Sequence, residues 1–264
     1  MKLAISNIAW GAAEDDLIYS WMRDYGFSGL EIAPTRIFPD APYKELERAK
    51  DWAKMLKRAE ALDVASMQSI WFGRKEMLFG SEAERQTLLD YTKMAVDFAE
   101  ALGCKNLVFG CPRNRMRPEN ASEDIALSFF KEIGDYASKH GTCIGLEANP
   151  VIYGTNFINT TPQAMELIKR VKSPGLRLNF DLGTLIANDE NIEEALQNVE
   201  WINHVHISEP FLKPIEKRAL HRVLMRDLNA AGYKGWVSIE MGRQEELSII
   251  KNTIQEISRL AELQ

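Results

Sequence analysis

Short apolar runs rich in β-forming residues alternate with longer segments of helical spacing along the whole of this chain. Eight such runs are predicted as strands, at residues 3–10, 29–34, 64–70, 106–111, 143–148, 176–181, 202–208 and 236–241. The segments between and after them carry apolar residues every three or four positions, which is the period of an amphipathic helix. Strands that alternate with helices in this way are parallel and are joined by right-handed crossovers.

Two architectures can hold eight parallel strands, an open doubly wound sheet and a closed (β/α)8 barrel. No glycine-rich dinucleotide-binding turn follows the first predicted strand, where the chain reads IAWGAAEDD. The length of 264 residues is close to the value of about 250 that is typical of one α/β barrel. No linker or break in composition divides the chain. We therefore predict a (β/α)8 TIM barrel that forms a single domain over residues 1–264.

Composition and charge argue against several classes of partner. The 32 basic and 38 acidic residues give a net charge of −6, whereas a protein that binds nucleic-acid phosphates usually has a basic face. No apolar run approaches the roughly 20 residues that cross a bilayer, and the first apolar stretch is too short for a signal peptide. Three cysteines are too few for a disulfide framework, which favours the cytoplasm. We expect a small-molecule substrate, no nucleic-acid or membrane partner, and a homodimer or homotetramer.

Polar residues end most of the predicted strands. In a TIM barrel, the carboxyl ends of the strands and the loops that follow them build the active site. The polar strand ends are Glu31, Gln68, Glu147, Asp181, His206 and Glu240. The last four lie on successive strands, in the apolar segments IGLEANP, LNFDLGT, HVHISEP and VSIEM. A charged residue in a barrel strand is costly to bury unless it is paired or bound to a cation.

Three carboxylates and one imidazole form a ligand set that suits a hard or borderline divalent ion. We expect one such ion, Mn²⁺, with Mg²⁺, Co²⁺ or Zn²⁺ as alternatives, and the lack of thiolates argues against a structural zinc site. The competing interpretation is that each residue is an isolated ion pair or hydrogen-bonded group at its strand end. The clustering of all four residues on consecutive strands favours the metal site.

The segments GFSGLEIAP at the second strand and GYKGWVSIEM at the eighth, together with these strand ends, resemble a known superfamily. It is the sugar phosphate isomerase/epimerase superfamily of xylose isomerase-like TIM barrels, which includes the ketose 3-epimerases, and the resemblance covers nearly the whole chain. It implies that the metal ligands are Glu147, Asp181, His206 and Glu240. It also implies that Glu147 and Glu240 act as an acid/base pair on either side of the substrate carbon.

Candidates for substrate contacts follow the strand ends, and they are Trp10, Gln68, Trp71, Asn149, Tyr153, Glu209, Lys213 and Arg113. Trp10 and Trp71, with Phe72, would form an apolar wall for a sugar ring, the alternative being that they pack under loops. Asn149 and Tyr153 would form hydrogen bonds to substrate hydroxyls, unless they only stabilise their own loop.

Charged residues near the predicted rim add further candidates. The loop after the fourth strand carries Arg113, Arg115 and Arg117, which would bind a phosphate or carboxylate, and a solvated run of charges is the alternative. By the resemblance, Lys213 is the cation nearest the place where the epimerases carry an arginine. Thr184 stands where they carry a substrate-binding histidine.

Two residues flank His206 on its strand and in the following loop. Glu209 would accept a hydrogen bond from a substrate hydroxyl or from an imidazole, or would be a solvated loop charge. His204 is expected to point away from the barrel interior, as a hydrogen-bonded histidine between the strand and the helix layer.

The sequence therefore predicts a metal-dependent sugar isomerase or epimerase that acts on a small keto-sugar or polyol derivative. One glutamate would remove a proton beside a carbonyl, the metal would stabilise the enediolate, and the other glutamate would return the proton. Alternatives on the same site are a dehydratase, which expels a β-hydroxyl as water, and a catalytically inactive sugar-binding barrel. The presence of only four histidines and the net charge of −6 argue against a phosphodiesterase of the endonuclease IV type.

Overall fold

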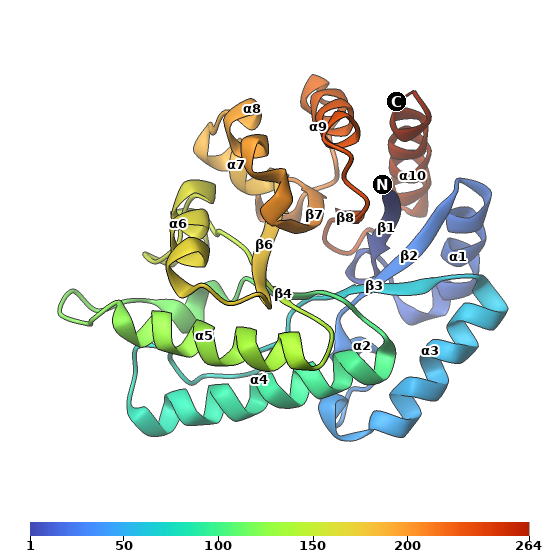
Figure 1. Cartoon of the computed structure of the whole chain (residues 1–264). Coiled ribbons are helices and arrows are strands. Elements are labelled where there is room, and N and C mark those ends of the chain that lie inside the picture. The colour runs from blue at the N-terminus through green and yellow to red at the C-terminus, as the bar shows by residue number, and fades with distance from the viewer. Residues whose placement is uncertain (264) are drawn as a thin grey trace.

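The structure is a computed structural model and describes residues 1–263. Eight parallel strands close into a barrel, in which each strand pairs with its neighbours in chain order and β8 pairs with β1 (Figure 1). The strands are β1 Lys2–Ser6, β2 Phe27–Ile32, β3 Asp63–Met67, β4 Leu107–Phe109, β5 Ile144–Leu146, β6 Leu176–Asp181, β7 Ile202–Ser208 and β8 Trp236–Glu240. This arrangement confirms the predicted (β/α)8 TIM barrel.

The observed strands differ from the predicted ones mainly at their carboxyl ends. β6 and β7 have the predicted bounds, whereas the other strands end between one and four residues earlier. β1 stops at Ser6 because Asn7–Ala9 forms a 3-10 turn, and the Asn7 Oδ1 atom accepts the Ala33 backbone N–H at 2.9 Å. Buried loop residues continue the apolar pattern beyond each strand, so the pattern alone does not mark where the backbone leaves the sheet.

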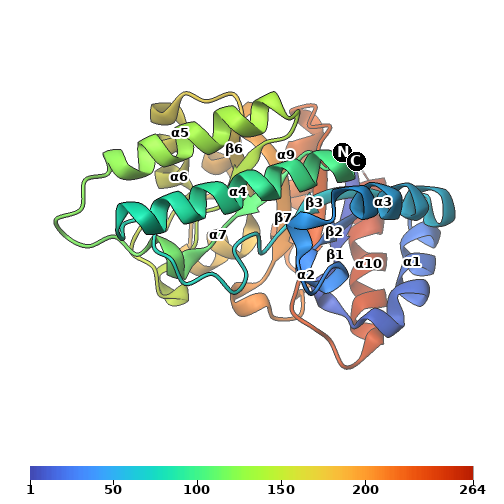
Figure 2. The same ribbon diagram turned by 90° about the horizontal axis from the view of Figure 1, so that it is seen from below.

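Helices form the outer layer around the strands in both ribbon views (Figures 1 and 2). They are α1 Asp15–Asp24, α2 Pro34–Ile37, α3 Leu46–Glu60, α4 Glu82–Leu102, α5 Asp124–Lys139, α6 Thr161–Val171, α7 Leu182–Asn188, α8 Ile192–Ala195, α9 Ala219–Ala230 and α10 Leu247–Glu262. Local signals set their ends: a capping box of Ser81 and Glu84 begins α4, and Gly103, with a φ of 71°, ends it. Within residues 1–263, no helix is long and apolar enough to cross a membrane.

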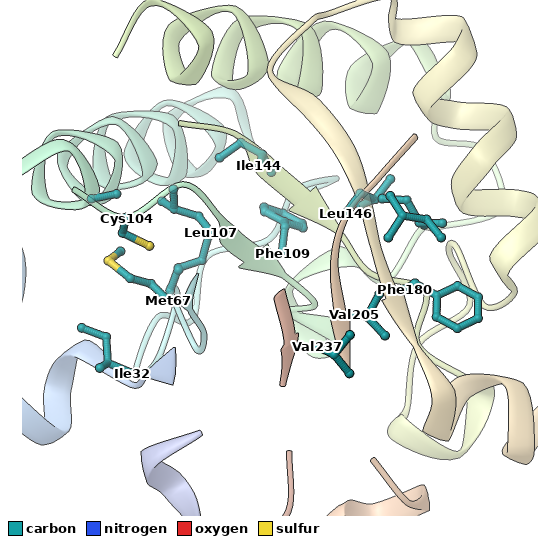
Figure 3. Packing of buried hydrophobic residues seen from close by; sticks show 14 of the residues in the cluster. Ile32, Met67, Cys104, Leu107, Phe109, Ile144, Leu146, Phe180, Val205 and Val237 are labelled. Carbon is teal, nitrogen blue, oxygen red and sulfur yellow. The ribbon is translucent and has the colours of Figure 1, made fainter. Parts of the chain in front are cut away.

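Buried hydrophobic side chains form the core between the strands and the helices, and Figure 3 shows Phe109 of β4 among them. The ring of Phe109 is fully buried, and its centroid lies 4.6 Å from that of Trp71 and 4.9 Å from that of Phe130. The Trp71 indole N–H donates to the Thr92 hydroxyl of α4 at 2.8 Å. Trp71 is therefore packed between the barrel and α4. The expected apolar wall does not include it, because the residue is buried, its ring contacts Phe109 and Phe129, and its N–H is bonded to Thr92.

The inside of the barrel contains a chain of polar side chains in addition to apolar residues. The Asn106 amide donates to the Ser66 hydroxyl at 2.9 Å and to the Asn179 Oδ1 atom at 3.3 Å. At the amino end of β7, the Asn203 amide donates to the Asn106 Oδ1 atom at 2.9 Å. These bonds satisfy buried groups that would otherwise be costly. They also connect the lower part of the barrel to the carboxyl ends of the strands.

Removal of the Phe109 ring should destabilise the fold strongly. Phe109→Ala deletes a fully buried ring and leaves a cavity, for which we expect a loss of about 3–5 kcal/mol in the free energy of unfolding. Phe72→Ala is the matched control, because 69% of the Phe72 side chain is exposed, and its effect should stay within about 0.5 kcal/mol. Urea unfolding followed by circular dichroism measures both. Equal midpoints for the two variants would contradict this assignment of the core.

Candidate metal centre

The four predicted ligands converge at the carboxyl ends of β5 to β8. Glu147 directly follows β5, Asp181 and Glu240 end β6 and β8, and His206 lies within β7. One ligand atom from each residue lies within 4.8 Å of the other three. Two oxygen ligands on opposite sides of an ion with bonds of about 2.1 Å stand roughly 4.2 Å apart, so small side-chain movements would suffice to bind one. The donor set fits a divalent cation of the type predicted.

His206 lies between two of the carboxylates. Its Nδ1 atom is 3.1 Å from the Glu147 Oε1 atom and 3.2 Å from the Glu240 Oε2 atom. Burial alone would lower the pKa of His206, but Glu31 and Glu240 raise it well above its usual value. In the protein without a cation, the imidazolium therefore supplies the positive charge that these carboxylates need.

Burial also changes the carboxylates themselves. It raises the pKa of Glu240 to about 7, with Glu147 as a further cause in the same direction. It raises the pKa of Asp181 to about 6, and the charge of Glu147 again adds to the shift. Desolvation and like charges both disfavour the ionised form, and a bound cation would reverse both effects.

Asp181 is held by four donors besides its place among the ligands. It caps the amino end of α7 and accepts hydrogen bonds from the Gly183 N–H at 3.3 Å and the Thr184 N–H at 2.9 Å. The Ser208 hydroxyl donates to Oδ1, which also accepts the Gly183 N–H, and the Thr184 hydroxyl lies 2.9 Å from Oδ2. Thr184 is buried and also lies 2.8 Å from the Ala148 carbonyl, so its hydroxyl serves the ligand and the backbone.

Glu147 is oriented by two amides. Asn149 donates to its Oε2 atom at 3.0 Å, and Asn179 donates to its Oε1 atom at 2.8 Å. The Arg115 guanidinium, which is fully buried, donates to the Glu147 carbonyl and to the Asn149 Oδ1 atom, both at 2.9 Å. Burial lowers the pKa of Arg115 to about 10. Arg115 thus fixes the backbone of Glu147 and the side chain of Asn149, which in turn donates to Glu147.

The three arginines that were expected together at the rim have different surroundings in the structure. Arg115 is buried beneath the site, Arg113 is exposed, and the Arg117 Nε donates to the Ala121 carbonyl at 3.0 Å. The prediction that all three bind a substrate anion is wrong for Arg115, because it is fully buried and its two terminal nitrogens donate to backbone and amide oxygens. The spacing of the three arginines in the sequence could not show which of them is buried. The burial of Arg115 depends on contacts with residues 147–158, which are distant in the chain.

The other predicted substrate residues divide into two groups. Gln68 reaches the site, where its amide donates to the Glu240 Oε1 atom at 3.1 Å and to the Ser6 hydroxyl at 2.8 Å. Tyr153 lies close enough that Asp181 contributes to raising its pKa to about 12, after burial as the larger cause. Its hydroxyl accepts the Phe211 backbone N–H at 2.7 Å.

The remaining candidates are engaged elsewhere or exposed. The Trp10 indole is buried and donates to the Asp15 Oδ1 atom at 2.7 Å. Both oxygens of Glu209 accept bonds of 2.7 Å from Arg218, a residue that the sequence interpretation missed. Lys213 is exposed on the loop after β7. The wall of aromatics is therefore not observed, because Trp10 is buried and Phe72 points into solvent.

His204 corrects a prediction about the direction of its side chain. It is fully buried inside the barrel, and its Nε2 atom lies 3.0 Å from the Glu31 Oε2 atom. Residues two positions apart on a strand share one face, so His204 and His206 must point the same way. The same rule would have found Asn179 and Ser208, which lie two residues from Asp181 and His206 on their strands.

Without a cation, the protein should become less stable as the pH rises from about 6.5 to 8. The pKa values of Asp181 and Glu240 are raised above those of the unfolded chain. Above about pH 6.5 the folded protein keeps protons on Glu240 and His206 that the unfolded chain has released, so its stability falls. Burial lowers the pKa values of His204 and His221, and these two residues offset the effect of Asp181 and Glu240 at lower pH. Thermal unfolding in chelator across this range tests the slope, which Glu240→Gln should flatten. Glu190→Gln is the control, and a wild-type Tm that rises with pH would contradict the prediction.

Curated relatives of this chain are sugar-derivative epimerases by name. The fructoselysine 3-epimerase of Shigella flexneri is 25% identical over 174 residues. That match spans 62% of this chain and 62% of the relative's length. The fructoselysine 3-epimerase of Escherichia coli O157:H7 matches over the same extent with the same identity.

Solved structures share the fold over nearly the whole chain. D-psicose 3-epimerase from Clostridium cellulolyticum H10 has a TM-score of 0.80 at 14% identity and covers 100% of this chain and 99% of that one. The 3-keto-D-glucoside 4-epimerase from E. coli has a TM-score of 0.74 at 19% identity and covers 98% and 99%. Residues 19–263 match the family described as xylose isomerase-like TIM barrel. This chain therefore belongs to the xylose isomerase-like TIM-barrel family.

Proposed function

We propose that this chain is a divalent-metal-dependent isomerase or epimerase of a small keto-sugar or polyol derivative. The observation that carries the proposal is the convergence of Glu147 and Glu240 with Asp181 and His206, each with a ligand atom within 4.8 Å of the others. Three carboxylates at such separations repel each other unless they are protonated or share a cation. These four residues would hold the ion, Mn²⁺ in our proposal.

The bound cation would polarise the substrate carbonyl and its neighbouring hydroxyl. One of the two glutamates then takes the proton from the carbon beside the carbonyl, which gives an enediolate. The other glutamate returns a proton to the opposite face for epimerisation, or to the neighbouring carbon for isomerisation. Burial raises the pKa of Glu240 to about 7, which brings its proton affinity near the range in which a general acid or base works best at neutral pH.

Neighbouring amides hold the two glutamates in place for this task. Gln68 donates to Glu240, while Asn149 and Asn179 donate to the two oxygens of Glu147. A carboxylate fixed by such bonds cannot rotate away from the reacting carbon without losing them. We propose Gln68 and Tyr153 as the substrate contacts among the residues at this end of the barrel.

The names of the similar proteins support the substrate class. A 3-epimerase of a 2-ketose such as psicose and a 4-epimerase of a 3-keto-glucoside both invert a carbon next to a ketone. Fructoselysine 3-epimerase fits the same description. A site that binds a carbonyl and has a carboxylate on either side of the adjacent carbon suits this shared reaction.

Incubation with Mn²⁺ in D₂O tests the proposed chemistry. With D-psicose, D-fructose and fructoselysine as trial substrates, the product should carry deuterium at the carbon beside the carbonyl. Glu147→Gln and Glu240→Gln should each lower kcat by at least about 100-fold, because each lacks one proton-transfer group. Glu190→Gln should keep the wild-type rate, since Glu190 binds only the Thr161 N–H and Asn188 near the end of α7.

Metal content is measured for every variant so that loss of the ion is not mistaken for loss of the base. Wild-type rates in both glutamine variants with metal still bound would overturn the acid/base assignment. A product that has lost the elements of water would instead support the dehydratase alternative.

A further inference from the structure

We propose that Glu31 is a positioning residue that fixes which nitrogen of His206 faces the metal site. This inference rests on the proposed function, because it assumes a divalent cation among the carboxylates. Glu31 reaches His206 across the barrel interior from β2, and 175 positions separate the two residues in the chain. Glu31 is not itself one of the four proposed ligands.

The contact is direct and fully buried. The Glu31 Oε2 atom lies 2.9 Å from the His206 Nε2 atom and 3.0 Å from the His204 Nε2 atom. All three side chains have no exposed surface. An ionised carboxylate without solvent costs several kcal/mol to bury, and an apolar residue in its place is often as stable or more stable. The position of Glu31 therefore points to a task other than stability.

The task follows from the chemistry of imidazole. A neutral imidazole carries one N–H and one lone pair, and a carboxylate accepts only the N–H. With Nε2–H donated to Glu31, the lone pair of His206 is on Nδ1, the atom that faces Glu147 and Glu240. A carboxylate behind a metal-bound histidine also makes the imidazole a stronger ligand.

A second contact favours the same tautomer. The Asn179 Nδ2 atom lies 3.3 Å from the His206 Nδ1 atom. Asn106 donates to the Asn179 Oδ1 atom, so the amide of Asn179 must present its N–H groups to the site. A donor aimed at Nδ1 is compatible with a lone pair there. Glu31 on one side and Asn179 on the other thus both select Nε2–H for the neutral ring.

His204 packs against the same carboxylate without a hydrogen bond to it among the described residues. Its Nε2 atom lies at the same carboxylate oxygen as that of His206, and the two rings meet edge to face with centroids 5.1 Å apart. Within residues 1–263, the Glu31 Oε1 atom has no hydrogen-bond partner. The orientation of Glu31 therefore depends on its hydrogen bond with His206, with His204 as a packing neighbour.

The same three residues could in principle bind a cation of their own, since their donor atoms also lie within 4.8 Å of one another. Ligands on one tetrahedral ion, with bonds of about 2.05 Å, stand roughly 3.3 Å apart. The observed separations of 2.9 and 3.0 Å are shorter than this, and the contact of 2.9 Å between His206 and Glu31 is a hydrogen bond. The geometry therefore favours a hydrogen bond from His206 to Glu31 over an ion shared by the three residues.

Metal affinity of the chelator-treated protein tests the proposal. Co²⁺ titration followed by visible absorption, with Mn²⁺ calorimetry in parallel, should show one site in the wild type and none in His206→Ala. Glu31→Leu should weaken binding by about 10- to 100-fold. Glu31→Gln should weaken it less, because the glutamine oxygen can still accept the Nε2–H. His221→Leu is the matched control, a buried histidine of α9 outside the site, and should bind as the wild type does.

A spectroscopic measurement separates positioning from loss of structure. In Zn²⁺-loaded protein labelled with nitrogen-15 histidine, His206 should show a protonated Nε2 and an unprotonated Nδ1, and Glu31→Gln should restore this pattern where Glu31→Leu loses it. A wild-type His206 with the proton on Nδ1 would overturn the proposal even if Glu31→Leu does not fold.

The remaining outcomes distinguish this inference from the proposed function. Unchanged affinity in Glu31→Leu and Glu31→Gln, with binding lost in His206→Ala, would overturn the role of Glu31 and leave the metal enzyme standing. A second equivalent of Co²⁺ that disappears in Glu31→Leu would also overturn it, since Glu31 would then be a ligand. No binding by the wild type would overturn both.

Discussion

The imidazole of His206 contacts three buried carboxylates, and the carboxyl end of the barrel depends on these contacts. Glu31, Glu147 and Glu240 each place an oxygen between 2.9 and 3.2 Å from one of its nitrogens. Unpaired, each of these ions would be costly to bury. One small ring therefore offsets the repulsion among groups contributed by strands from both halves of the sequence. A cation at the site would take over part of this role and free the ring to become a ligand.

Asp181 has two structural roles at the carboxyl end of the barrel. It caps α7 while it faces the other proposed ligands, so the helix that follows β6 and the candidate metal site share one carboxylate. The four donors on its oxygens keep it ordered without an ion. Pre-ordering of this kind reduces the conformational entropy that ligand binding must remove. The strand order of the barrel thus delivers a site in which each ligand has its own support.

The fold and the convergence of the four proposed ligands were predictable from the sequence, because both follow from the pattern of strands and strand ends. Eightfold alternation fixed the strand order, and polar residues at the ends of apolar strands marked Glu147, Asp181, His206 and Glu240. Contacts that depend on packing between distant segments were not predictable. Arg115 and Arg113 are two positions apart in the same loop, yet one is buried beneath Glu147 and the other is exposed. The wrong direction predicted for His204 could have been avoided from the sequence. Residues two positions apart on a strand point to the same face, so His204 had to point the same way as His206.

The polar chain inside the barrel has a direction. At its amino end, the Lys105 backbone carbonyl can only accept, so the amide of Asn203 must turn an N–H toward it at 3.1 Å. Asn203 gives its remaining N–H to Asn106, which in turn donates to Asn179, and Asn179 donates to Glu147. Each amide is thereby set by the one before it, and no single side chain can flip without leaving two oxygens or two N–H groups facing each other. The backbone carbonyl of Lys105 at the amino end of the barrel thus determines that Glu147, at the carboxyl end, faces an N–H group of Asn179.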